Sequence, residues 1–339
     1  DLTDKDQIVN KDAVSMLVSL GIIEGKPDGS YAPTENVDRA QMAKMLSVIM
    51  NKGVDNSALY QSVNSGLTDI TSNWAKGHIN YCYTTGIIAG RGNGTFDPSA
   101  TVTALEAAKM LLVAVGYDPK IEGFEGADWA INVSVRADEQ GIFEGFTKDL
   151  SAPLNRDDAA LLIYNALDVE MIQSYTTNNY PIVYSDHRTI LSDKYGVIKV
   201  EGVVTANEWA ILDDDTDTAL QEGKTRIYNP DGILSTTGNT AVAQDSSANV
   251  KTQVFNVSTP VDMLGKAVTM YVKKTTILAD STVYGAPVVS DVNTVIETGE
   301  KVTGGDSKDD DSLAALLKGT GLATDKATEY YLSLIHISE

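Results

Sequence analysis

Cysteine and basic residues are scarce in this sequence of 339 residues, and it has no long apolar run. The single cysteine, Cys82, excludes a disulfide within the chain, and we expect it to be a small apolar residue on a helix. Lysine and arginine number 26 against 47 aspartates and glutamates, so the net charge is −21. Such a charge repels nucleic-acid phosphates and anionic lipid head groups. We therefore expect no nucleic-acid partner, and no membrane insertion because a spanning helix needs roughly 20 apolar residues.

Sequence motifs for catalysis and metal binding are also missing. The only histidines are His78, His187 and His336, and they share no metal-ligand spacing with Cys82. The chain has no Gly-x-Ser-x-Gly, His-Glu-x-x-His or phosphate-loop motif. The acidic run Asp213–Asp217 lacks the glycine and the final glutamate of a helix–loop–helix calcium site, so it indicates a solvated turn. The sequence thus predicts a protein that is not an enzyme and has no cofactor or bound metal.

What the sequence does contain is an internal repeat. Three segments are alike, LGIIEGKPDGSYAP, TGIIAGRGNGTFDP and QGIFEGFTKDLSAP, and their first glycines are Gly21, Gly86 and Gly141. A second glycine follows four positions later in each segment, and a proline follows twelve positions later. Three matches in one register predict three copies of one supersecondary unit. The second glycines are Gly25, Gly90 and Gly145.

Each copy carries the pattern of two helices around this turn. Before the first glycine, apolar residues recur at spacings of three and four, as in Ala13, Met16 and Leu20. After the turn, a cap residue stands three positions before an acid or amide, as Asp38 does before Gln41. One such unit cannot bury its apolar face, whereas three can do so around a shared axis, with grooves between neighbours. We therefore predict repeats at residues 1–55, 64–118 and 122–175.

These repeats resemble the S-layer homology domains of bacterial surface proteins. The resemblance rests on Leu67-Thr68-Asp69, Trp74-Ala75, the turn after Gly86 and the helix opening VDRAQ at 37–41, which is similar to the family's Thr-Arg-Ala-Glu signature. It covers residues 1 to about 170, and three tandem copies are the family's usual number. The resemblance implies an all-α, pseudo-threefold bundle that binds a secondary cell-wall polysaccharide, often one that carries a ketal-linked pyruvate.

The resemblance also implies which residues bind this polymer. By position, Arg39 and Arg156 are the partners of a pyruvyl carboxylate, which a planar guanidinium binds with two hydrogen bonds. Asp4 and Asp69 are expected to bind sugar hydroxyls or to orient those arginines. The other expected carbohydrate-binding residues are the groove walls Trp74 and Trp129, the glycines Gly25, Gly90 and Gly145, and Arg91.

A purely structural interpretation of these residues stays open. Trp74 and Trp129 lie on the apolar stripes of their helices, where packing in the core is the alternative to forming a groove wall. Asp69 also suits a cap at a helix entry, and the glycines are turn formers in either interpretation. Arg39 and Arg156 lie in first helical turns, where the helix dipole disfavours a cation, and this favours a ligand role.

Departures from the family's pattern predict fewer than three working grooves. Repeat 2 has Ala104 in place of the signature arginine, so its groove is either inactive or relies on Arg91. Repeat 1 has Val9 in place of the tryptophan, and repeat 3 has Phe124 in place of the early aspartate.

After Tyr175 the helical periodicity stops, and threonine, valine and tyrosine become frequent. This composition predicts a mostly antiparallel β domain at 178–304, either a small barrel or a sandwich. Residues 305–339 begin with an acidic linker and end in a tail, 332–339, that fits nothing before it and resembles a translated sequencing adapter. We expect the natural chain to continue differently there.

Together these features predict an α+β multidomain surface protein of a Gram-positive bacterium, located in the cell wall or S-layer. Its predicted function is non-catalytic attachment to an anionic, pyruvylated secondary cell-wall polysaccharide, with other S-layer subunits as further partners. Two alternatives remain, a cell-surface hydrolase that the same module anchors and an adhesin whose β half binds a partner. A catalytic acid–base pair in a longer chain would favour the first, and separate binding by residues 176–339 would favour the second.

Overall fold

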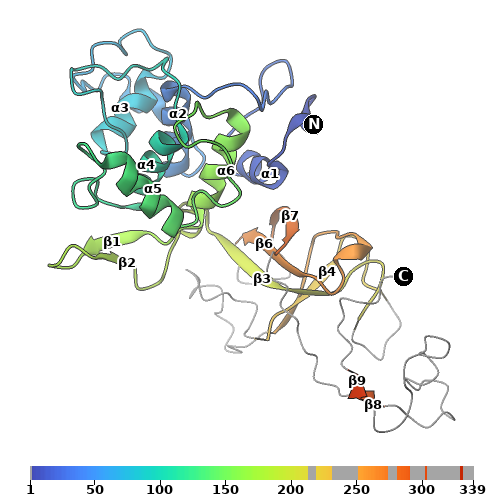
Figure 1. Ribbon diagram of the computed structural model, residues 1–339. Coiled ribbons are helices and arrows are strands. Elements are labelled where there is room, and N and C mark those ends of the chain that lie inside the picture. Colours follow the sequence, from blue (N-terminus) through green and yellow to red (C-terminus); the bar gives the residue numbers. More distant parts are fainter. Residues whose placement is uncertain are drawn as a thin grey trace.

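The computed structural model describes residues 2–212, 219–230, 251–273, 281–290, 302–303 and 329–330. A helical part is followed by a β part (Figure 1), which confirms the α+β class. The turn predicted at Asp213–Asp217 lies outside the described residues, and so does the linker and tail predicted at 305–339, apart from residues 329–330.

The helical part contains three successive pairs of α-helices. The second helix of each pair begins with a capped turn, as predicted. The helices are α1 (Lys11–Ser19), α2 (Arg39–Met50), α3 (Lys76–Thr84), α4 (Ala104–Val115), α5 (Trp129–Glu139) and α6 (Arg156–Leu167). Cys82 is a fully buried residue of α3, which confirms its apolar role. Among the described residues, no helix has the length and apolar character needed to span a membrane.

The caps explain where α2, α4 and α6 begin. The Asp38 carboxylate accepts a hydrogen bond from the Gln41 N–H at 2.7 Å, and the Gln41 amide oxygen accepts one from the Asp38 N–H at 3.0 Å. Thr103 and Glu106 form the same reciprocal pair at the start of α4. At α6 the side chain of Asn155 is the acceptor. These bonds satisfy N–H groups that the first helical turn leaves without partners.

Short extended segments before these caps link the three helix pairs in a closed cycle. The Val37 N–H donates to the Leu154 carbonyl at 2.8 Å, and the Leu154 N–H donates to the Val102 carbonyl at 2.7 Å. The Val102 N–H completes the cycle by donating to the Val37 carbonyl at 2.9 Å. All three side chains are buried. The cycle therefore brings the first turns of α2, α4 and α6 together at the centre of the helical part.

The β part is antiparallel, as predicted. A hairpin of β1 (Ile172–Tyr175) and β2 (Pro181–Val183) comes first, and β8 (Val302–Thr303) pairs with β9 (Glu329–Tyr330). Between them lies a five-stranded sheet in the order β5-β4-β3-β6-β7. Its strands are β3 (Val197–Ala206), β4 (Thr225–Tyr228), β5 (Thr252–Phe255), β6 (Ala267–Lys273) and β7 (Val283–Val289).

The strand order decides against one of the two predicted β architectures. In the described residues, β5 and β7 are opposite edges of the sheet and do not pair with each other. The small barrel is therefore wrong for these strands, because a barrel needs its first and last strands to be hydrogen-bonded. The sandwich stays a prediction.

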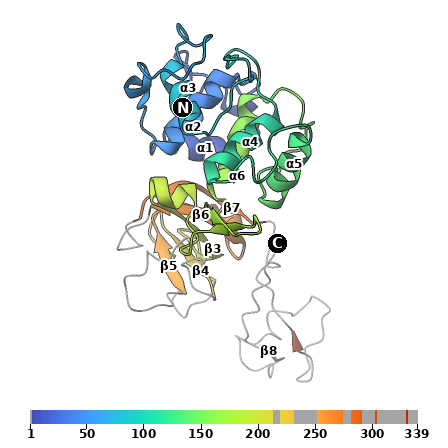
Figure 2. The same ribbon diagram turned by 90° about the vertical axis from the view of Figure 1, so that its left-hand side faces the viewer.

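The sheet packs against the helical part, on one side of it in both views (Figures 1 and 2). The main hydrophobic core extends from the helices to Tyr195, Val197 and Tyr271. Tyr271 packs edge-on against Tyr164 of α6, with 5.7 Å between the ring centroids. This contact connects the third helix pair directly to the sheet.

His78 is a buried base in α3, and the residue is 3% exposed. Its Nδ1 lies 2.6 Å from the Ser47 hydroxyl, and its Nε2 lies 3.6 Å from the Asp55 carboxylate. Burial lowers the pKa of His78 from the ordinary 6.5, Asp55 acts in the opposite direction, and Lys44 adds to the lowering. The folded protein therefore holds this imidazole neutral at neutral pH.

We expect the free energy of unfolding to decrease as the pH falls through 6.5 toward the lower folded pKa of His78. In that window the unfolded state binds more protons than the folded state, so acid favours unfolding. The variant His78→Gln keeps an amide that can bond Ser47 and removes the titration. Denaturant midpoints measured from about pH 7.5 to about pH 5 should decrease less in this variant. An identical decrease in both proteins would contradict this role of His78.

Candidate functional site

Two pockets lie between helix pairs at equivalent places. We call them the Arg39 groove, with a volume of about 580 Å³, and the Arg156 groove, with a volume of about 480 Å³. Each groove is lined by residues of all three helix pairs. One pair contributes the arginine, the next pair contributes a glycine turn and its second helix, and the remaining pair contributes a tryptophan. The Arg39 groove includes Arg39, Ala89, Gly90, Arg91, Glu106, Lys109, Met110 and Trp129. The corresponding residues of the Arg156 groove are Arg156, Glu24, Gly25, Lys26, Gln41, Lys44, Met45 and Trp74.

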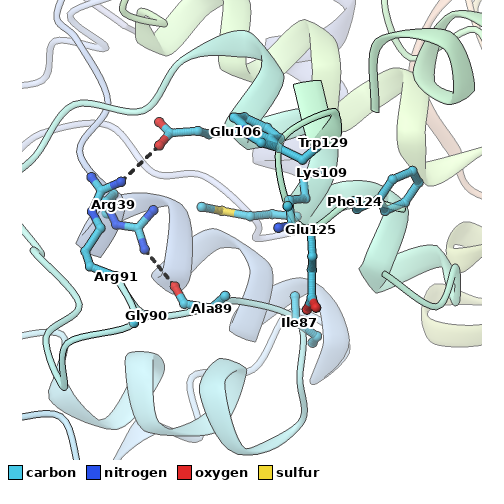
Figure 3. Close-up of a pocket in the computed structure, with 13 residues that line it drawn as sticks. Arg39, Ile87, Ala89, Gly90, Arg91, Glu106, Lys109, Phe124, Glu125 and Trp129 are labelled. Atoms are coloured by element: carbon cyan, nitrogen blue, oxygen red, sulfur yellow. Dashed lines mark hydrogen bonds and ion pairs between the residues drawn. The ribbon is translucent and has the colours of Figure 1, made fainter. Parts of the chain in front are cut away.

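Arg39 is a buried cation at the edge of its groove (Figure 3) and is 4% exposed. Its Nε donates to the Phe96 carbonyl and its Nη2 to the Ala89 carbonyl, both at 2.8 Å. The guanidinium carbon lies 4.4 Å from the centre of the Phe96 ring. Burial lowers the pKa of Arg39, but a guanidinium remains charged in proteins. Two of its five N–H donors are used in these bonds, so others remain to bind a carboxylate.

Arg156 repeats this geometry in the second groove. Its Nε donates to the Tyr31 carbonyl at 2.8 Å and its Nη2 to the Glu24 carbonyl at 3.1 Å. Its guanidinium carbon lies 4.8 Å from the centre of the Tyr31 ring. Each arginine is thus held by the glycine turn of the next helix pair, through a carbonyl and an aromatic ring of the same residue.

Asp4 and Asp69 line neither groove. Asp4 accepts hydrogen bonds from the N–H groups of Tyr31 and Ala32, both at 2.7 Å. Asp69 accepts them from Phe96 at 2.9 Å and from the next residue at 2.6 Å. The Tyr31 N–H lowers the pKa of Asp4, and at Asp69 the two N–H groups outweigh the opposing effect of burial. Both carboxylates therefore fix the turns that hold the arginines.

The two tryptophans differ in exposure. Trp74 is 58% exposed and touches the buried His78 only edge-on, with 6.3 Å between the ring centroids. This exposure excludes the core role for Trp74. Trp129 is partly buried against the core, and the Lys109 ammonium lies 5.7 Å from the centre of its ring. Each indole lines the same groove as an arginine, Trp129 with Arg39 and Trp74 with Arg156.

A third set of equivalent positions combines residues of the three helix pairs in the same order as the two grooves. This set lacks both the arginine and the tryptophan. It pairs Ala104, in place of the arginine, with Val9, in place of the tryptophan, and its glycine is Gly145. Gly145 lines neither groove. In this place Lys148 forms an ion pair with Asp158, and the Asp157 carboxylate accepts a hydrogen bond from the side chain of Asn10 at 2.9 Å. The two sequence departures thus fall in the same set of equivalent positions.

Arg91, predicted as the alternative to the arginine missing at Ala104, lines the Arg39 groove, with its guanidinium 3.3 Å from the Glu106 carboxylate and 3.5 Å from the Asp97 carboxylate. Two groove residues that sequence reasoning missed are Lys44 and Lys109. Each lies three positions after the cap-bonding residue, Gln41 or Glu106, and so on the same helix face.

The grooves are basic places in an acidic chain. Arg39, Arg91 and Lys109 face Glu106 and Glu125 in the Arg39 groove. In the Arg156 groove the three cations face the single acid Glu24. A groove lined by both a fixed guanidinium and an indole can bind a carboxylate and a sugar ring at the same time.

Comparison with known proteins relates the chain to bacterial surface proteins. The family model described as the S-layer homology domain matches residues 1–43 and 66–108. A cell surface protein of Thermoanaerobacter kivui is 28% identical over 234 residues, which are 68% of this chain and 28% of that protein. An S-layer protein of Bacillus licheniformis is 33% identical over 113 residues, 33% of this chain and 12% of that protein. An amylopullulanase of Thermoanaerobacterium thermosulfurigenes is 30% identical over 173 residues, 47% of this chain and 9% of that protein.

These relatives are much longer than the present chain, which spans less than a third of each. The first match covers 68% of the chain, so it extends beyond the helical part and into the β part. The matched segments contain α1, the turn that follows it and the start of α2, and then the equivalent elements of the second pair. The chain therefore carries S-layer homology domains in these two segments, and its similarity to cell surface and S-layer proteins indicates an extracellular location in association with the cell wall.

Proposed function

We propose that this chain attaches a surface protein, without catalysis, to an anionic and pyruvylated secondary cell-wall polysaccharide. The observation that supports the proposal is the pair of equivalent grooves, each lined by a fixed arginine and a tryptophan. Because the chain has a net charge of −21, an anionic polymer is attracted only where cations are gathered. The two grooves are such places.

We further propose that the helical part is a pseudo-threefold bundle of three S-layer homology repeats, at 1–55, 64–118 and 122–175. The hydrogen-bonded cycle of Val37, Val102 and Leu154 supports this symmetry. The third repeat is supported by the equivalent contacts of Arg156 and Arg39. The β domain at 178–304 follows, and the linker and tail at 305–339 complete the proposed organisation.

In each groove the arginine binds a pyruvyl carboxylate, and the indole covers an apolar face of a sugar ring. A bidentate guanidinium–carboxylate pair fixes orientation as well as charge. Asp4 and Asp69 act as positioning residues, since they bond the turns that hold the arginines. The third combination, with Ala104 and Val9, binds no anionic sugar because it has neither group. Other S-layer subunits are further partners through surfaces outside the grooves.

A second candidate is that the chain is the anchoring part of a surface enzyme. The observation that favours it is the similarity of 173 residues to a small part of an amylopullulanase. In that case the grooves keep the function proposed above, and the catalytic residues belong to a longer protein.

Co-sedimentation of the whole chain with Gram-positive cell walls tests the proposed function. We expect the protein to pellet with intact walls, to stay in solution with walls stripped of their secondary polymer, and to pellet weakly with walls whose pyruvate ketals have been removed by mild acid. Retention on stripped walls equal to that on intact walls would refute polymer binding. Retention that is unaffected by ketal removal would refute the pyruvyl carboxylate as the recognised group.

A further inference from the structure

The two grooves differ at one equivalent position on the second helix. In the Arg39 groove this position is Glu106, and in the Arg156 groove it is Gln41. Both side chains bond the N–H of their cap residue, Glu106 at 3.1 Å and Gln41 at 3.0 Å. The two side chains therefore have the same capping function, but they differ in charge, since Glu106 is negatively charged and Gln41 is neutral.

The carboxylate of Glu106 neutralises a cation inside its own groove. It lies 3.3 Å from the Arg91 guanidinium, and both residues line the Arg39 groove (Figure 3). Glu125 adds a second carboxylate to this lining. A ligand carboxylate that enters the Arg39 groove therefore approaches the fixed carboxylate of Glu106 and the exposed carboxylate of Glu125, and it has to compete with Glu106 for Arg91.

In the Arg156 groove, the cation equivalent to Arg91 forms its ion pair with an acid that lies outside the groove. Lys26, which corresponds to Arg91, forms an ion pair with Glu35, and Glu35 does not line the groove. The only acid in the lining is Glu24, which lies 3.5 Å from Lys44 and whose side chain is 76% exposed. Exposure to water weakens the repulsion that Glu24 exerts on an entering anion.

We infer that the Arg156 groove binds the anionic sugar unit more tightly than the Arg39 groove, and that Gln41 in place of Glu106 sets this difference. The inference rests on the proposed function and states which of the two grooves has the higher affinity for the anionic sugar unit. One carboxylate within a partly screened groove changes the affinity for a singly charged ligand by on the order of tenfold. The polymer is therefore held by one strong and one weaker contact.

Reciprocal exchange of the two residues tests the inference, because glutamate and glutamine both keep the cap bond. The probe is a methyl hexoside that carries a pyruvate ketal, and the methyl ester of its carboxylate is the uncharged control. Trp129→Ala isolates the Arg156 groove and Trp74→Ala isolates the Arg39 groove. Isothermal titration of the whole chain then reports the affinity of each groove separately.

We expect the acid probe to bind on the order of tenfold more tightly in the Trp129→Ala protein than in the Trp74→Ala protein. Adding Gln41→Glu to the former should weaken binding by a similar factor, and adding Glu106→Gln to the latter should strengthen it. The ester should respond to neither exchange. Equal affinities that the exchanges leave unchanged would overturn the inference and leave the proposed function standing. Failure of both grooves to bind the acid probe would overturn both.

Discussion

Replacing Trp74 and Trp129 together by alanine is expected to abolish most of the binding to cell walls and to leave the fold intact. Large aromatic side chains at the centre of a binding site contribute about 2 kcal/mol or more when truncated, a factor of about 30 in affinity for each groove. Trp74 is 58% exposed, so its loss removes little buried surface. In the proposed function the two grooves bind one polymer, so loss of both should also remove the gain from simultaneous binding.

The single variants should bind measurably less than the parent, and the double variant should fall to the level of stripped walls. The measurement is the fraction of protein that pellets with walls over a range of wall concentrations. Thermal unfolding of each variant checks the fold, because Trp129 packs partly against the core.

Two matched controls are available in the same chain. Trp209 is 63% exposed in the β part, so Trp209→Ala removes an equally accessible indole far from the grooves in sequence. Val9 is 83% exposed and occupies the tryptophan position of the third combination, so Val9→Ala tests whether that place contributes. Neither control should change pelleting. A double variant at Trp74 and Trp129 that pellets like the parent protein would show that the grooves are not the binding site.

Sequence reasoning located the helix pairs well because their signals are local. The cap at Asp38 lies three residues from its partner Gln41, and Gly21, which has a positive φ, directly follows the C-cap residue of α1. Such short-range patterns fix where a helix begins and ends without knowledge of the rest of the chain. The α+β class followed from the same kind of signal.

The composition of each groove could not be predicted in this way. A groove combines residues from all three helix pairs, so a departure in one repeat affects a groove whose other residues lie in different repeats. Ala104 and Val9 appear in repeats 2 and 1 of the sequence, yet they belong to the same combination in space. The closed cycle through Val37 shows why, because each helix pair contacts both of the others.

The sheet was the least predictable part. Its central pairing joins β3 to β6, with Val197 opposite Lys273, so the partners are far apart along the chain. Strand composition indicates that a segment is extended and does not identify its neighbour. The choice between a barrel and an open sheet depends on exactly those neighbours.

Replacing Gly77 by alanine is expected to destabilise the fold by about 3 kcal/mol. Gly77 is buried in α3, and a Cβ atom there would lie 2.1 Å from the Ser57 carbonyl oxygen. That oxygen belongs to backbone, so α3 or the 3-10 helix Ser57–Tyr60 has to move, and the Trp74 side of the Arg156 groove moves with α3.

The sign of this effect is diagnostic, since alanine in an ordinary helix interior is about 1 kcal/mol more favourable than glycine. The matched control is Gly66→Ala, at a glycine with a φ of +77° and no atom within 4 Å of the added Cβ. It should cost about 1 kcal/mol through the backbone alone. Denaturant unfolding of both variants separates the two effects. A Gly77→Ala protein as stable as the parent would mean that α3 does not pack on the Ser57 carbonyl. It would also contradict the proposal that this contact positions Trp74 at its groove.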